Sequence, residues 1–183
     1  MEQAHFMLYT DGGSYNNGFK QGKDKPQICS SALVVTLNEN TLFETCKGYE
    51  GDNATISFAE INAAYLSVKA LDKVIKNMKI SLSKPYRVTI VSDSQLVVKG
   101  INEWIWNWCE RDWKNGAGAP VGQAELWKKF FYEYLDKEDE WYIDALHVKG
   151  HAKIEDYNNI MNDKCDKMAV AKVAEMKKEK GID

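Results

Sequence analysis

The order of its β-prone and helix-prone segments limits what this chain can fold into more than any other feature of the sequence. Five apolar, β-prone segments stand at residues 5–10, 29–37, 42–48, 86–92 and 141–148. Segments with a helical spacing of apolar residues stand at 57–78, 94–105, 124–136 and 158–180. The first three strands follow one another directly, whereas helices separate the last two, and strands joined through helices run parallel. We therefore predict an α/β fold: a mixed five-stranded sheet, made of an antiparallel meander plus parallel strands, flanked by helices.

Length and composition favour one globular domain over residues 1–183. The chain is 44% hydrophobic and 28% charged, as is typical of a soluble protein. No apolar run approaches the roughly 20 residues of a membrane-spanning helix. The N-terminal MEQAHFMLYTDGGS lacks the basic segment and apolar stretch of a secretory signal. We expect a cytoplasmic protein without a membrane partner.

The cysteines indicate neither a zinc site nor a disulfide framework. Cys29, Cys46, Cys109 and Cys165 are scattered and form no CxxC pair. We expect ordinary buried or half-buried thiols.

Two of the predicted strands end at an aspartate. Asp11 follows the first strand, and Asp93 follows the fourth. If these strands are parallel neighbours, both carboxylates project from the sheet edge at which sites form in α/β folds. The structural alternative is that each is a turn former or a helix cap, and Asp93 before SQLVV fits a cap. Taken singly, each aspartate favours this alternative.

Glu60 and Asp166 each have a structural and a functional interpretation. The segment Ser57 to Glu60 matches an S-x-x-E capping box, and spacing alone favours capping over a side chain directed at Asp11. Asp166 is expected early in the last helix, either as a solvated charge near the positive end of the helix dipole or at the sheet edge. The buried face of that helix is expected to hold Met161, Cys165, Met168 and Ala169.

Five sequence blocks, taken in order, resemble the successive signatures of type 1 ribonucleases H. They are YTDGGS, FAEINAAYLSVKAL, VSDSQLVVKGINEWIWNW, VKGH and NDKCDKMA, and together they extend over roughly residues 6–172. Each block alone is weak, but the ordered set is specific. The resemblance implies the ribonuclease H-like fold and an endonuclease that hydrolyses the RNA strand of an RNA–DNA hybrid. We also expect one domain over residues 1–183, without a separate hybrid-binding domain.

The resemblance assigns the catalytic, metal-binding carboxylates to Asp11, Glu60, Asp93 and Asp166. Carboxylates suit Mg²⁺, with Mn²⁺ as a possible substitute, and two ions about 3.5–4 Å apart can activate water and stabilise the leaving oxygen. By resemblance Asp11 bridges both ions, Asp166 holds the ion that carries the attacking water, and Glu60 and Asp93 hold the other.

Among the histidines, the resemblance singles out only one for catalysis. His151 of VKGH becomes a proton shuttle or product-release group, because histidine titrates near working pH. His5 and His147 match no such position and are expected to be structural. Asp163 matches a further acidic position and is at most accessory.

Substrate contacts are also implied by the resemblance. It places Ser14, Asn17 and Gln95 near the nucleic-acid backbone and Thr55 near a DNA-strand phosphate. Because the tryptophan-rich segment carries few cations, we further expect Trp104 to contact the sugar-phosphate backbone. Serine and asparagine in a turn are equally well explained as turn formers. Ile56 and Ser57 depart from the family, which often carries asparagines before the glutamate, so minor-groove contacts are expected to be weaker or rearranged.

The tryptophan-rich segment 101–123, which we call the handle, departs from the basic handle of the family. It carries Arg111 and Lys114 against Glu103, Glu110 and Asp112 and is therefore slightly acidic. Its tryptophans are Trp104, Trp106, Trp108 and Trp113, and at least two are expected in the core. The overall charge of −3 also argues weakly against a nucleic-acid partner, although a carboxylate metal site contributes to it.

Two other functions compete with a hybrid-specific nuclease. One is a non-catalytic nucleic-acid-binding module with the same fold, which the presence of all four carboxylates disfavours. The other is a related nuclease or integrase-like enzyme acting on DNA, which the SDSQ, tryptophan and GH blocks disfavour. We expect an RNA–DNA hybrid as the partner, no obligate protein partner, and a monomer.

Overall fold

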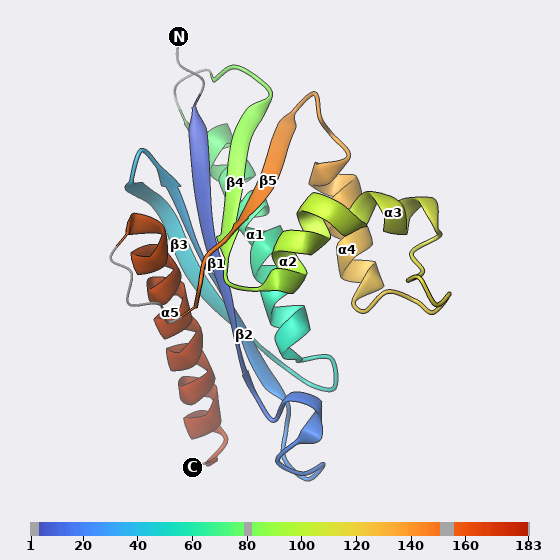
Figure 1. Ribbon diagram of the computed structural model, residues 1–183. Helices are drawn as coiled ribbons and strands as arrows, with labels where there is room; N and C mark the ends of the chain where they lie inside the picture. The colour runs from blue at the N-terminus through green and yellow to red at the C-terminus, as the bar shows by residue number, and fades with distance from the viewer. Residues whose placement is uncertain (1–3, 79–81, 151–155, 183) are drawn as a thin grey trace.

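A computed structural model describes residues 4–78, 82–150 and 156–182 (Figure 1). The strands are β1 (His5–Tyr15), β2 (Ile28–Leu37), β3 (Asn40–Glu50), β4 (Tyr86–Ser92) and β5 (Trp141–His147). The α-helices are α1 (Ile56–Asn77), α2 (Gln95–Lys99), α3 (Ile105–Glu110), α4 (Ala124–Phe130) and α5 (Tyr157–Glu179). Short π-helical segments, Gly100–Trp104 and Phe131–Leu135, continue α2 and α4.

The strands form one mixed sheet in the order β3-β2-β1-β4-β5. The pairs β1–β2 and β2–β3 are antiparallel, whereas β1–β4 and β4–β5 are parallel. The predicted meander plus parallel strands is therefore confirmed. Every predicted strand and helix is present, with the differences in length and continuity given below.

Helices cover both faces of this sheet (Figure 1). α1 packs on one face, together with α2 and α4, and α5 packs on the other. Alternate residues of a strand point to opposite faces, so Leu8 and Ile90 are buried in the core beneath α1, whereas Tyr9 and Val91 are buried beneath α5. The central strands are apolar on both faces because both faces are covered.

The first strand is longer than the predicted segment 5–10, because it continues through the polar DGGSY segment to Tyr15. Gly12 and Gly13 lie in β1 where both helical layers come closest to the sheet. A Cβ on Gly12 would lie 2.9 Å from the Cβ of Ala59 in α1. A Cβ on Gly13 would lie 3.1 Å from the carbonyl oxygen of Ala169 in α5. These glycines therefore serve helix packing rather than a turn.

The helix predicted over residues 94–105 is divided into α2, the π-helical segment and α3. Trp113 belongs to the main core and Trp108 packs half-buried against it, so one of the two or more handle tryptophans expected in the core is fully buried there. Trp106 is 44% exposed. Trp127 of α4 fills the interior instead, and its ring lies 5.5 Å from that of Trp108.

The predictions on the cysteines are confirmed. All four are free, with Cys29 and Cys165 buried and Cys46 and Cys109 half-buried. No helix in the described part of the chain combines the length and the apolar character that crossing a bilayer requires.

We predict that Gly12→Ala lowers the free energy of unfolding by about 1–3 kcal/mol, because the added methyl group must displace Ala59 and the backbone nitrogen of Glu60, also 2.9 Å away. Gly116→Ala is the matched control, since a Cβ there meets no atom within 4 Å. Its effect should stay within about 0.5 kcal/mol. Urea unfolding of both variants measures the difference, and equal stability would contradict the close packing of α1 on β1.

Candidate active site

The parallel pairing of β1 with β4 brings Asp11 and Asp93 to the same level of the sheet. Tyr9 stands opposite Val91, and each aspartate follows two residues later. β4 ends at Ser92, so Asp93 leaves the sheet, whereas Asp11 lies inside β1 and still pairs with Ala32 of β2. The expectation that both aspartates follow their strands is therefore wrong for Asp11, whose strand continues along β2.

Asp11 is the electrostatic centre of this region. Its side chain is 6% exposed. Burial and, next, the negative charge of Asp93 raise the pKa of Asp11 from the usual 3.8 to about 7, with smaller contributions from Asp166 and Glu60. The Gly12 N–H, which donates to Oδ1 at 2.7 Å, opposes this rise. The other three predicted carboxylates therefore all act on Asp11.

Glu60 does not cap its helix, so the capping-box interpretation is wrong. The N-cap of α1 is Thr55, whose hydroxyl accepts a hydrogen bond from the Phe58 N–H at 3.2 Å. Glu60 instead accepts a hydrogen bond from the Ser94 hydroxyl at 2.6 Å. Burial raises the pKa of Glu60, the Ser94 bond opposes this, and repulsion from Asp93 adds to it. Its carboxylate is thereby held toward the end of β4.

Asp93 is not a helix cap either. The N-cap of α2 is Ser94, whose Oγ accepts from the Val97 N–H at 3.4 Å. The backbone carbonyl of Asp93 accepts a hydrogen bond from His147 Nε2 at 3.1 Å. Gly150 passes so close that a Cβ there would overlap the Asp93 carboxylate. His147, predicted to be structural, therefore supports the backbone of this aspartate.

Asp166 reaches the same region from the opposite face of the sheet. It is the tenth residue of α5, so the expected position near the N-terminal end of the helix dipole is wrong. Its neighbour Cys165 is buried, as are Met161 and Ala169, whereas Met168 is half-buried. Asp163 forms an ion pair with Lys167. His151 lies outside the described residues.

The donor set fits divalent cations in its chemistry. Four carboxylates supply the hard oxygen atoms that Mg²⁺ and Mn²⁺ prefer. Burial and the neighbouring carboxylates both raise the pKa of Asp11, and a divalent cation would offset their effect. Within the described ranges, no group of three or more His, Cys, Asp or Glu side chains is close enough to hold a metal ion. The carboxylates thus surround Asp11 without meeting at ligand distance.

Two of the predicted substrate contacts line one groove beside the handle. Asn17 and Thr55 lie in a groove of about 440 Å³ together with Ser57 and Trp108. Asn17 Oδ1 also accepts from the Ile56 N–H at 3.1 Å, so this residue helps to begin α1. The groove therefore joins the start of α1 to the handle.

The other three predicted substrate contacts do not line that groove. Ser14 is exposed near the end of β1, and Gln95 is exposed at the first position of α2. Trp104 is half-buried, with its ring 5.7 Å from that of Trp108. The sequence analysis did not identify Ser94 as a partner of Glu60 or Trp108 as part of the groove. The position of Ser94 directly before a helical segment, where serine often acts as an N-cap, was the available signal.

Comparisons with known proteins agree with one another. The family model described as RNase H matches residues 3–174. Ribonuclease HI of Vibrio parahaemolyticus is 38% identical over 172 residues, which cover 90% of this chain and 87% of that protein. Ribonuclease H of Treponema denticola is 27% identical over 167 residues, covering 89% and 93%.

Solved structures share the fold at low sequence identity. The solution structure of the PFV RNase H domain has a TM-score of 0.66 and 22% identity, and the match covers 93% of this chain and 95% of that one. LC9-RNase H1, described as a type 1 RNase H with the type 2 active-site motif, has a TM-score of 0.64 and 16% identity, covering 95% and 74%.

We predict that Asp11→Asn stabilises the metal-free protein at neutral pH. In wild type, the folded state keeps a proton on Asp11 that the unfolded chain releases. The free energy of unfolding of wild type is therefore highest below about pH 4 and falls as pH rises through about 7. From about pH 4.5 to about pH 8, the free energy of unfolding should fall by roughly 2–4 kcal/mol more in wild type than in the variant. Urea unfolding in EDTA measures this, with exposed Asp24→Asn as control. If the free energies of unfolding of wild type and Asp11→Asn changed with pH in parallel, an unfavourable charge on the folded protein's Asp11 would be contradicted.

Proposed function

The chain belongs to the RNase H family, and on that premise we propose that it is an endonuclease that hydrolyses the RNA strand of RNA–DNA hybrids. The observation that carries the proposal is the buried Asp11, whose pKa is raised by burial and then by the charge of Asp93, with smaller contributions from Asp166 and Glu60. Members of this family depend on divalent metal ions. A site built from carboxylates at the end of a parallel strand pair suits that dependence.

We propose that Asp11, Glu60, Asp93 and Asp166 hold Mg²⁺, with two ions during catalysis. When bound, these ions supply an activated water and neutralise the charge on the leaving oxygen. The chain supplies the positioning: Ser94 holds Glu60, the start of α2 and His147 fix the backbone around Asp93, and α5 brings Asp166 from the other face. His151 stays a prediction as the proton shuttle or product-release group.

The hybrid is proposed to contact the chain along the groove beside the handle. Asn17 and Thr55 would bind the backbone there, with Ser14, Gln95 and Trp104 as further contacts. An enzyme of this class recognises RNA by its 2′-hydroxyl groups. The handle carries few cations, so we expect weak binding with a shallow salt dependence.

The single-domain organisation, the monomeric state and the cytoplasmic location also stay predictions.

The decisive experiment is cleavage of four labelled substrates: an RNA–DNA hybrid, duplex RNA, duplex DNA and single-stranded RNA. With Mg²⁺ we expect cleavage of the hybrid alone, in its RNA strand, and none in EDTA. Asp93→Asn should keep the fold and lower the rate on the order of 10³-fold, the equivalent of several kcal/mol of metal stabilisation. Cleavage of duplex DNA would instead indicate a DNA nuclease, and hybrid binding without cleavage would indicate a non-catalytic module.

A second variant separates a ligand from a structural role at Glu60. Glu60→Gln keeps an oxygen that can accept from the Ser94 hydroxyl but removes the charge. Because burial and Asp93 already disfavour that charge, thermal stability in metal-free buffer should stay constant or rise while hydrolysis of the hybrid collapses. Thermal unfolding and initial rates are measured on the same preparation. Stability and activity falling in proportion would show that Glu60 is structural.

A further inference from the structure

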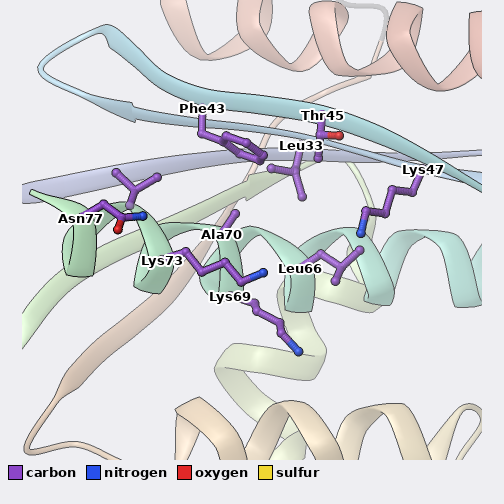
Figure 2. Close-up of a pocket in the computed structure, with 10 residues that line it drawn as sticks. Leu33, Phe43, Thr45, Lys47, Leu66, Lys69, Ala70, Lys73 and Asn77 are labelled. Atoms are coloured by element: carbon purple, nitrogen blue, oxygen red, sulfur yellow. The ribbon is translucent and has the colours of Figure 1, made fainter.

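A second groove lies between α1 and the edge strand β3, away from the carboxylates. Figure 2 shows side chains of α1 on one side and of β3 on the other. The groove has a volume of about 550 Å³. Glu60 precedes its first helical residue, Leu66, by six positions, and the lining continues to Asn77, so the groove extends from roughly 9 to 25 Å beyond Glu60 along the axis of α1.

The groove exists because β3 extends beyond the strip of sheet that α1 covers. Phe43 and Thr45 alternate along β3 and face the helix, and Phe43 is 41% exposed. On α1, Leu66, Ala70 and Val74 recur every fourth residue, which places them on one face of the helix. The floor is therefore apolar and is only partly covered by the fold itself.

The rim of this groove is positively charged. It carries Lys47, Lys69 and Lys73 and no acidic residue. Lys69 Nζ lies 3.3 Å from the Tyr65 hydroxyl and 5.5 Å from the centre of the Tyr65 ring, so it is engaged on another side of the helix. Within the described ranges, Lys47 and Lys73 have no ion-pair partner. In a chain of net charge −3, this local excess of cations favours an acidic occupant.

The edge strand adds a third requirement. β3 ends the order of the described sheet, so one side of its backbone lacks a neighbouring strand. Lysines on an edge strand also discourage unwanted pairing, which is the structural explanation for Lys47 alone. It does not account for Lys73 on α1 or for the apolar floor between the two lysines. An extended peptide added along β3 could use the backbone, the floor and both lysines.

We propose that this groove binds an extended acidic segment of a partner protein, with bulky apolar side chains between its carboxylates. Nucleic acid fits less well, because a phosphodiester backbone gains nothing from the apolar floor. A small anionic amphiphile would use the floor and the lysines but not the strand edge. The proposal is independent of the proposed hydrolysis, which serves only as a check on folding.

The probe is a fluorescein-labelled peptide, Asp-Thr-Phe-Thr-Leu-Thr-Asp, whose alternate positions present two carboxylates and two apolar side chains to one face. Fluorescence polarisation should show saturable binding to wild type. The double variant Lys47→Glu with Lys73→Glu should weaken it at least about tenfold. Lys23→Glu with Lys178→Glu, an equal change of charge at two exposed lysines outside the groove, should change it less than about twofold. Peptides with Asn for Asp, or Ser for Phe and Leu, should bind weakly.

Hybrid cleavage by the groove variant should match wild type, which establishes that it folds. If that variant does not fold, Phe43→Ser, a change at an exposed side chain, provides the second test and should also weaken peptide binding. Absence of saturable binding, or equal weakening in the control pair, would overturn the proposal. Tighter binding of dodecanoate than of the peptide would also overturn it and would assign the lysines to a small amphiphile. Weaker hybrid binding by the groove variant would overturn it too and would assign the lysines to nucleic acid.

Discussion

The parallel pairing of β1 with β4 is the contact on which the arrangement of the carboxylates depends. A shift of this register by one residue would turn Asp11 to the opposite face of the sheet and separate it from Asp93. The pairing places a buried carboxylate beside the end of the neighbouring strand, where desolvation and like charge both oppose its ionisation. Folding therefore maintains a cluster whose negative charge is unfavourable, and perturbed pKa values of this kind are typical of functional sites.

The surrounding elements are shaped to keep that cluster together. Gly12 lets α1 lie against β1, which brings Glu60 near Asp11, and Gly13 does the same for α5 on the other face. Ser94 begins α2 and also bonds Glu60, so one side chain joins two elements of the site. The site is thus assembled from both helical layers, and its geometry depends on how closely they approach one sheet.

The sequence predicted the mixed sheet and the order of its elements along the chain because alternating and helical periods are local properties of the chain. It also pointed to Asp11 and Asp93, since both follow apolar segments. It failed at Glu60, because S-x-x-E is a local pattern, whereas the real cap is Thr55, beside Asn17 from a distant loop. The continuation of β1 was missed for a related reason: glycine is typical of turns, and only tertiary packing shows that a helix needs the space.

The groove beside β3 illustrates the same limit, since it depends on the offset between α1 and the edge strand rather than on any motif. The most direct test of the central claim is Mn²⁺ binding to the metal-free protein. The decrease of the electron paramagnetic resonance signal of free Mn²⁺ measures this binding. Wild type should bind Mn²⁺ saturably, exposed Asp24→Asn should bind it equally well, and Asp11→Asn should bind it at least about tenfold more weakly. Identical binding curves for wild type and Asp11→Asn would contradict a metal site centred on Asp11.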